Sequence, residues 1–283
     1  MKQNLTYLIL CALLLCSASV YAQQTNYKTD YVRAKEYYMR GNDAYDNLLY
    51  GIAIENYQKA ISMYPNFAEA YNNMGIAYYN QGKYSQAIAA YQKAISIDPN
   101  DAEAYYNMGI AYADQGNYSQ AIAAYEKAIN IKPDYADAYG NMGFAYYNQG
   151  KYSQAIAACE KAISIKPNYA NAYNNMGNAY DKQGKYSQAI AAYEKAISIK
   201  PDFAIAYYNM GIAYKAQGKY SQAIAAYEKA ISIKPDFAEA YHNMGVAYNN
   251  QGKRSQAIAA YQKAVRLGDS GSQEWLRDNG YSW

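Results

Sequence analysis

Hydrophobic and polar positions recur along this chain at one fixed interval. In residues 68–78, large apolar side chains stand three or four residues apart, at Tyr71, Met74 and Tyr78, with polar residues between them. The same phrase returns at equal steps, and its first position is Tyr71, Tyr105, Tyr139, Tyr173, Tyr207 and Tyr241. A fixed period of this size predicts a stack of repeated supersecondary units, each packed against its neighbours.

Each period contains a recognisable pattern, Tyr71-x2-Met74-Gly75-x2-Tyr78, followed by Ala87-x3-Tyr91, Ala94 and Pro99. This pattern resembles the tetratricopeptide repeat, in which Trp, Leu and Phe occupy the places of the first Tyr, the Met and the second-phrase Tyr. The resemblance implies a helix-turn-helix unit. The fold expected is all-α, a right-handed α-solenoid of seven helix pairs with a C-terminal capping helix.

Local signals place the ends of these helices. Asn66 and Asn100 follow a proline and are expected to cap the first helix of a pair, with Glu69 in capping-box spacing. Gly82 is expected to end that helix in a left-handed conformation. Ser85 is expected to cap the second helix, and Gly75 is small so that the paired helices can approach closely.

The repeats account for most of the chain. We expect a signal peptide at 1–22, a polar lead-in at 23–33, seven repeats within 34–271, and a capping helix at 272–283. The repeats are assigned to 34–67, 68–101, 102–135, 136–169, 170–203, 204–237 and 238–271. The first is degenerate, with Leu48 at the place of the inter-helix glycine. In the last segment, Ser272 is expected to cap a helix whose apolar side includes Trp275, Leu276, Tyr281 and Trp283.

The segment 1–22 resembles a secretory signal peptide, with Lys2, an apolar run from Leu5 to Leu15, and a small-residue cleavage site before Gln23. The run is shorter than the roughly 20 residues of a membrane span. Two alternatives remain open, an uncleaved anchor and lipidation at Cys16. Lipoprotein signals require a small residue at the place of Leu15, which disfavours the second. The chain is therefore expected to be exported, periplasmic or envelope-associated in a Gram-negative bacterium.

A polar stripe on the first helices is the candidate binding surface, which by resemblance to the family faces the concave groove. Its repeated carboxamides are Asn73, Asn107, Asn141, Asn175, Asn209 and Asn243. Beside them stand Ile76, Ile110, Phe144, Asn178, Ile212 and Val246. A carboxamide both donates and accepts hydrogen bonds, so it can hold a peptide backbone whatever the sequence. The arrangement resembles the asparagine ladder of the repeat domain of O-linked N-acetylglucosamine transferase. The alternative is that this Asn is a surface residue copied by repeat duplication.

The stripe also carries Glu69, Glu103, Asp137 and Glu239, with Lys182 as the main exception. It therefore favours a neutral or basic partner segment over a free carboxylate. The partner expected is a protein or peptide, with a self-associating structural component as the alternative. The formal net charge is only +3, and Lys and Arg are spread over the repeats, which disfavours nucleic-acid binding.

Nothing in the sequence indicates catalysis, a metal or a cofactor. The single histidine, His242, has no nucleophile or carboxylate in its phrase, and no phosphate-binding loop is present. Cleavage after Ala22 would leave Cys159 as the only thiol, at a place that holds tyrosine in other repeats. We interpret it as an apolar filler of the helix interface. The protein is expected to be a non-enzymatic interaction scaffold.

Overall fold

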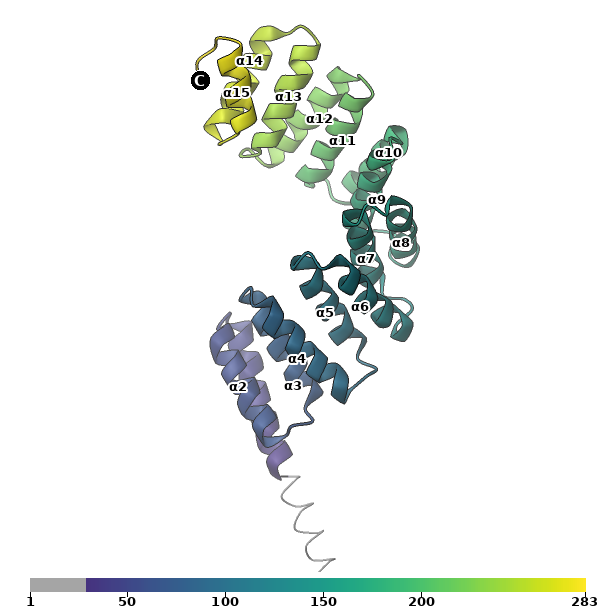
Figure 1. Cartoon of the computed structure of the whole chain (residues 1–283), viewed down its shortest axis with the longest axis vertical. Helices are drawn as coiled ribbons and strands as arrows, with labels where there is room; N and C mark the ends of the chain where they lie inside the picture. The colour runs from purple at the N-terminus through teal and green to yellow at the C-terminus, as the bar shows by residue number, and fades with distance from the viewer. Residues whose placement is uncertain (1–28) are drawn as a thin grey trace, which may run out of the picture. The chain divides into compact units, whose positions relative to one another are not determined.

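The structure is a computed structural model that describes residues 29–283. The predicted signal peptide, including Cys11 and Cys16, lies outside the described residues. From residue 29 onward the chain forms α-helices joined by short turns, and this part contains no β-strand (Figure 1). None of its helices is both long enough and apolar enough to cross a bilayer.

Residues 29–46 form the first described helix. The helices that follow are α2 (Tyr50–Met63), α3 (Ala68–Asn80), α4 (Tyr84–Ile97), α5 (Ala102–Asp114), α6 (Tyr118–Ile131), α7 (Ala136–Asn148), α8 (Tyr152–Ile165), α9 (Ala170–Lys182), α10 (Tyr186–Ile199), α11 (Ala204–Ala216), α12 (Tyr220–Ile233), α13 (Ala238–Asn250), α14 (Arg254–Arg266) and α15 (Ser270–Asp278).

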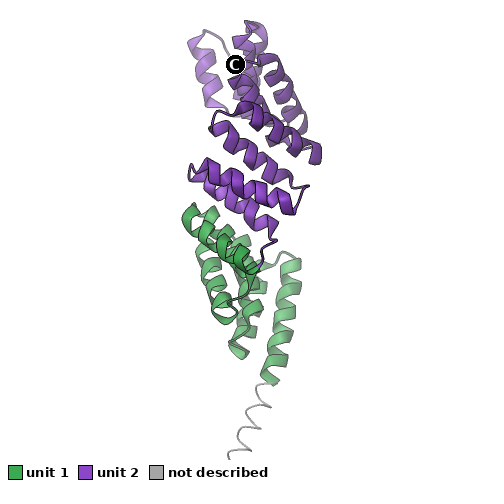
Figure 2. Cartoon of the chain, turned by 90° about the vertical axis from the view of Figure 1, so that its right-hand side faces the viewer, with its two compact units in different colours: residues 1–131 green, residues 132–283 purple. Residues whose placement is uncertain are grey.

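The chain divides into two compact units, one ending at Ile131 and the other beginning at Lys132 (Figure 2). In the first unit α2 packs on α3, α3 on α4, α4 on α5 and α5 on α6. In the second unit the helices from α7 to α14 pack in the same consecutive manner, and α15 packs on α14. The predicted fold class, an α-solenoid of helix pairs with a C-terminal capping helix, is confirmed.

The seam between paired helices is built from a glycine and a tyrosine. Tyr91 of α4 is 1% exposed, and its ring lies directly over Gly75 of α3. A Cβ atom at Gly75 would stand 2.5 Å from the Tyr91 ring, so only glycine allows this approach. The same packing recurs between Gly211 and Tyr227. The fourth repeat replaces the ring with Cys159, which is fully buried.

The turns between paired helices contain left-handed residues, as expected for helix C-termini. Gly82 has φ of +72°, and glycine holds the same place in the later repeats. In the first repeat this conformation falls on Leu48, with φ of +60°. Leu48 is the one non-glycine residue with positive φ among the described residues, and its side chain is 70% exposed.

The predicted N-caps are wrong. The residue that precedes α3 is Phe67, not Asn66, and its side chain makes no capping hydrogen bond. Aromatic residues hold this place before α7, α9, α11 and α13 as well. In several turns a lysine stands over the aromatic ring, for example Lys166 over Tyr169 at 4.7 Å. The ring therefore packs under this lysine, and the first N–H groups of these helices receive no side-chain cap. Among the first helices from α3 onward, only α5 has a side-chain cap, Asp101.

The predicted serine caps of the second helices are also wrong. Lys83 precedes α4, so Ser85 lies inside the first turn and does not cap it. Its hydroxyl oxygen instead accepts a hydrogen bond of 3.0 Å from Nε2 of Gln115, in the next repeat. Equivalent bonds join Gln217 to Ser187 and Gln251 to Ser221. These serines therefore link neighbouring repeats.

The capping helix α15 covers the end of the array. Leu276 is fully buried, and the Trp275 ring lies 4.2 Å from the Tyr261 ring, centroid to centroid. The prediction that Ser272 caps this helix is wrong, because the Asp269 side chain accepts the capping hydrogen bond from the backbone N–H of Ser272. Trp283 does not belong to the packed face, since it is 49% exposed.

Candidate functional site

The predicted stripe lies on the first helix of each repeat, from α3 to α13. Its asparagines and the residues beside them are half-buried, with the exception of Phe144, which is 44% exposed. Partial burial means that each carboxamide is within reach both of a neighbouring repeat and of solvent. The hydrogen bonds of the asparagines decide which atoms remain for a partner.

In the first unit, the amide groups of the stripe bond to the preceding repeat. Nδ2 of Asn73 donates to the hydroxyl of Tyr38 and to Oδ1 of Asn42, both at 3.0 Å. Nδ2 of Asn107 donates to Oδ1 of Asn72 at 3.4 Å. These donors therefore help to hold the repeats together.

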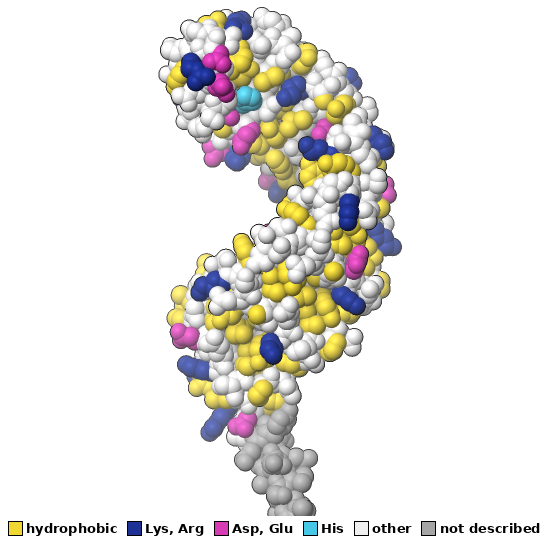
Figure 3. Space-filling model, in the orientation of Figure 1, with side chains coloured by type: hydrophobic (Ala, Val, Ile, Leu, Met, Phe, Trp, Pro, Cys, Tyr) yellow, Lys and Arg dark blue, Asp and Glu magenta, His cyan; other side chains and the backbone are white. Residues whose placement is uncertain are grey.

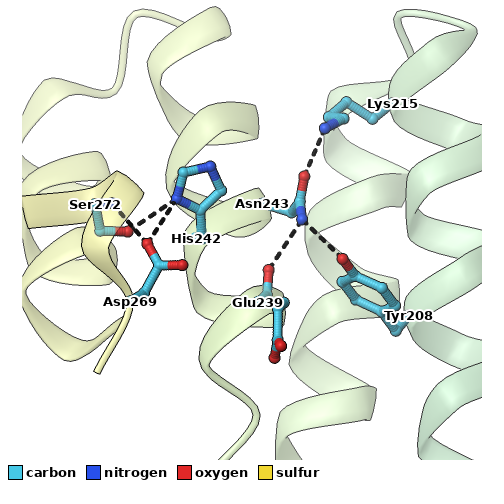
Figure 4. A network of polar contacts seen from close by, with 7 residues as sticks. All are labelled: Tyr208, Lys215, Glu239, His242, Asn243, Asp269 and Ser272. Atoms are coloured by element: carbon cyan, nitrogen blue, oxygen red, sulfur yellow. Dashed lines mark hydrogen bonds and ion pairs between the residues drawn. The ribbon is translucent and has the colours of Figure 1, made fainter. Parts of the chain in front are cut away.

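In the second unit, Nδ2 of Asn209 donates to Oδ1 of Asn174 at 3.1 Å and to Oδ1 of Asn178 at 3.0 Å. Asn243 is held more completely (Figure 4). Its Nδ2 donates to the Tyr208 hydroxyl and to the backbone oxygen of Glu239, and its Oδ1 accepts from Nζ of Lys215 at 2.6 Å. Burial lowers the pKa of Lys215. Asn243 thus has little capacity left for a ligand.

Asn175 differs from these asparagines. The places in the preceding repeat that supply acceptors elsewhere are held here by Gly140 and Phe144. Neither side chain can accept a hydrogen bond, and Asn175 makes no side-chain hydrogen bond within residues 29–283. Its whole carboxamide is therefore available, on the same stripe as the exposed Phe144.

Sequence reasoning placed these asparagines on one face but missed what their amide groups do. The partners Tyr38, Asn42, Asn72 and Asn174 were not among the predicted site residues. Periodicity could have found Asn42, because it stands one full period before Ile76, in the degenerate first repeat. The bonds themselves join residues of different repeats, and only the stacking of repeats brings those residues together.

Acidic side chains gather beside the stripe in the first unit. A hollow of about 640 Å³ is lined by both stripe residues and carboxylates, among them Asn73, Glu69, Asp98, Asp101 and Glu103. The face seen in Figure 3 shows Lys and Arg scattered singly among apolar and neutral side chains, without a basic patch. This charge pattern suits a neutral or basic partner.

His242 has partners that its own phrase did not reveal. Its Nδ1 lies 2.9 Å from the Ser272 hydroxyl and 3.1 Å from Oδ1 of Asp269, at the start of α15 (Figure 4). Both contacts use the same ring nitrogen, so Ser272 is not placed on the opposite nitrogen as a nucleophile would be. The cluster ties the capping helix to the last repeat.

The Cys159 thiol is buried in the seam of the fourth repeat. Burial raises the pKa of the Cys159 thiol to about 12, which suppresses the nucleophilic thiolate. Within the described residues, no three or more side chains of the metal-binding types converge.

Comparison with known proteins identifies the repeats. Family models described as TPR repeat match residues 50–82, 77–116, 109–150, 177–218 and 213–252. Models described as tetratricopeptide repeat match 136–169 and 238–268, and another matches 158–191. No curated protein gives a significant match.

Solved structures show the same architecture. A tetratricopeptide repeat protein from Parabacteroides merdae ATCC 43184 is 21% identical, with a TM-score of 0.69, over 87% of this chain and 98% of that one. MamA is 32% identical, with a TM-score of 0.53, over 59% and 97%. YrrB, described as a TPR protein with an unusual peptide-binding site, is 26% identical, with a TM-score of 0.54, over 66% and 96%.

Proposed function

Because the chain belongs to the tetratricopeptide-repeat family, we propose that its first-helix stripe binds an extended, neutral or basic segment of a partner protein. The family and its solved relatives support a protein–protein interaction scaffold. The stripe is the surface where recognition would take place.

The pairing of Asn175 with Phe144 carries this proposal. Asn175 presents an unused donor and an unused acceptor, which match the backbone amide of an extended peptide. Phe144 presents a large apolar ring to solvent beside it. Together they offer one contact that is independent of partner sequence and one that depends on it. YrrB, a TPR protein described as having an unusual peptide-binding site, gives this use of the fold a precedent.

The stripe is tested with single substitutions. A partner is first captured from a periplasmic extract, and its affinity is then measured by calorimetry. Asn175→Ala removes one or two partly exposed hydrogen bonds, each worth about 0.5–1.5 kcal/mol, so affinity should fall several-fold without loss of stability. Phe144→Ala should lower the affinity for different partners by unequal factors, because the fit against the Phe144 ring depends on the shape of the partner's side chain.

Asn209→Ala is the matched control. It removes two bonds between repeats, so it should lower the free energy of unfolding, whereas Asn175→Ala should not. Joint replacement of Asn107, Asn141 and Asn175 should weaken different partners by similar factors. Full affinity in the Asn175 and Phe144 variants, or a partner mapped to the second-helix face around Gln86 and Gln120, would rule out the stripe.

We also propose that the protein acts in the cell envelope after removal of the segment 1–22. The apolar run and the cleavage site of this segment support the proposal. Mass spectrometry of the protein from a periplasmic fraction should give a chain that begins at Gln23. A chain with an intact start, or one lipidated at Cys16, would contradict it.

Self-association is a second candidate, favoured by the N-terminal end of the array. Tyr31, Val32 and Met39 of the first described helix are 40–53% exposed and line a shallow apolar hollow. Sedimentation at several concentrations would detect an oligomer. Met39→Lys should abolish that oligomer while leaving peptide binding unchanged.

A further inference from the structure

Two polar pockets occupy the same place in two different repeats. The first, the Asn42 pocket, has a volume of about 260 Å³ and is lined by Asn42, Tyr45, Asp46, Tyr57, Asn73 and Ile76. The second, the Asn178 pocket, has a volume of about 160 Å³ and is lined by Tyr147, Asn178, Asp181, Lys182, Tyr193, Asn209 and Ile212. Apart from Tyr147, every residue of the second pocket stands four full periods after its counterpart in the first. One pocket lies in each unit.

Both pockets share a chain of hydrogen bonds that other repeats lack. The buried hydroxyl of Tyr193 donates to Oδ1 of Asn178 at 2.9 Å, and Tyr57 donates to Oδ1 of Asn42 at the same distance. Where isoleucine replaces this Asn, at Ile212, the facing Tyr227 hydroxyl is buried without a partner among the described residues. Asn42 and Asn178 therefore turn an apolar position into a polar one.

These bonds fix the orientation of the next carboxamide. In the Asn178 pocket both Nδ2 hydrogens of Asn209 are used, one by Asn174 and one by Asn178. Its Oδ1 accepts no hydrogen bond from any described residue. Asn73 is held in the same way in the Asn42 pocket, by Tyr38 and Asn42. Each pocket thus presents a preoriented acceptor.

Each pocket also contains a carboxylate, but the two stand at different places of the repeat, because Asp181 corresponds to Tyr45 and Lys182 corresponds to Asp46. Oδ1 of Asp181 is buried and has no hydrogen-bond partner within the described part of the chain. Burial raises the pKa of Asp181, and the nearby charge of Lys182 opposes that shift. Asp46 is exposed and forms no ion pair with any described residue. A buried acceptor without a donor is costly, so a ligand that donates to it would be bound favourably.

We propose that the Asn42 and Asn178 pockets each receive a lysine or arginine side chain of the bound partner segment, an inference that rests on the proposed stripe function. The carboxamide and the carboxylate would accept from the cationic group, and Ile76 or Ile212 would contact its methylene stem. Lys182 is exposed at the rim, where water screens its charge, whereas the Asp181 acceptor is buried. In the Asn42 pocket, whose lining contains no cation, a guest carboxylate would meet two acceptors and be rejected.

The test uses the whole chain with labelled isoleucine methyl groups, assigned by substitution. Nα-acetyl-lysine methylamide and Nα-acetyl-norleucine methylamide are titrated separately, because they differ only in the terminal ammonium. The lysine compound should shift the Ile212 and Ile76 signals saturably, and the norleucine compound should bind at least tenfold more weakly, equivalent to about 1.4 kcal/mol. Ile110 should not respond, because Ile76 stands before it at the place that Asn42 and Asn178 hold in the two pockets.

Two variants assign the effect to the pocket. Asn178→Ile and Asp181→Asn should each remove the preference for lysine at Ile212 but leave the response of Ile76 unchanged. Both should fold, because the chain already carries Ile at the place of residue 178 and Asn at the place of residue 181, as Ile212 and Asn249.

Three results would overturn the proposal: no saturable shift at either isoleucine, equal binding of the two compounds, or an unchanged preference in both variants. Each leaves the stripe function standing if a captured partner still depends on Asn175. Conversely, lysine binding at both pockets together with a partner on the second-helix face would refute the stripe function alone.

Discussion

Two buried tyrosines at the same place in successive repeats should respond oppositely to loss of the hydroxyl group. Tyr193→Phe removes the 2.9 Å bond to Asn178, whereas Tyr227→Phe removes a hydroxyl with no partner in the described chain. The two rings are 1% and 0% exposed, so their surroundings match closely. The hydrogen bond differs because Asn178 faces Tyr193 and Ile212 faces Tyr227. The Tyr227 ring also contacts Tyr208, whose place near Tyr193 is held by Asn174.

The magnitudes follow from the cost of buried polar groups. A net intramolecular hydrogen bond contributes about 0.5–1.5 kcal/mol, so Tyr193→Phe should lower the free energy of unfolding by about 1 kcal/mol. The Tyr227 oxygen exposes less than 1 Å² and has no partner among the described residues, and burial of such a group costs about 1–3 kcal/mol. Tyr227→Phe should therefore be neutral or stabilising.

Urea unfolding followed by circular dichroism gives the comparison. Because repeat arrays can unfold in parts, hydrogen exchange of α10 and α12 should accompany it and report each repeat separately. Equal destabilisation by both variants would refute the reasoning, since it would mean that the Tyr227 hydroxyl is as well satisfied as that of Tyr193. A neutral Tyr193→Phe would show that the bond to Asn178 contributes nothing.

Three further expectations concern the fold. Leu48→Gly should stabilise the first repeat by about 1 kcal/mol in thermal unfolding, because it relieves a left-handed leucine; an unchanged melting temperature would contradict this. Gly75→Ala should cost about 1–3 kcal/mol through overpacking on the Tyr91 ring, and a neutral result would mean that the ring moves freely. Cys159 should react with iodoacetamide at pH 8 only after denaturation, because the thiol is buried and its pKa is raised to about 12; rapid labelling of the native protein would show that the seam opens.

The capping helix should respond to acid. Burial by itself would raise the pKa of Asp269, but its bonds with Ser272 and the nearby His242 outweigh burial and hold the pKa below its usual value. A depressed folded-state pKa stabilises the fold above the unfolded value near 3.9, and that stabilisation is lost as the pH falls through the folded-state pKa. Fluorescence of Trp275 and Trp283 should therefore report loosening of α15 below about pH 4. In Asp269→Ala the loosening should already be present at neutral pH.

The fold could be predicted from the sequence because the seam between paired helices is made from positions that recur with the period. Gly75 and Tyr91 stand in fixed places, so their partners could be read without coordinates. The helix starts could not, since an aromatic ring beneath a lysine, as in Tyr169 and Lys166, takes the place that a polar cap has elsewhere. Only part of the candidate site could be predicted from the sequence, for a related reason. Asn175 is available because the side chains of Gly140 and Phe144 cannot accept a hydrogen bond from its amide group. Those two residues belong to the preceding repeat.

The serine–glutamine bonds between neighbouring repeats have an evolutionary consequence. Since the bond of Gln115 to Ser85 recurs as that of Gln251 to Ser221, a duplicated or deleted period would meet a matching surface on either side. Unequal recombination could therefore lengthen or shorten the gene in whole periods while each seam remained intact. The number of repeats between Asn42 and Asn178 would change in the same steps. Selection could thus adjust the length of segment that the protein reads without redesigning either pocket.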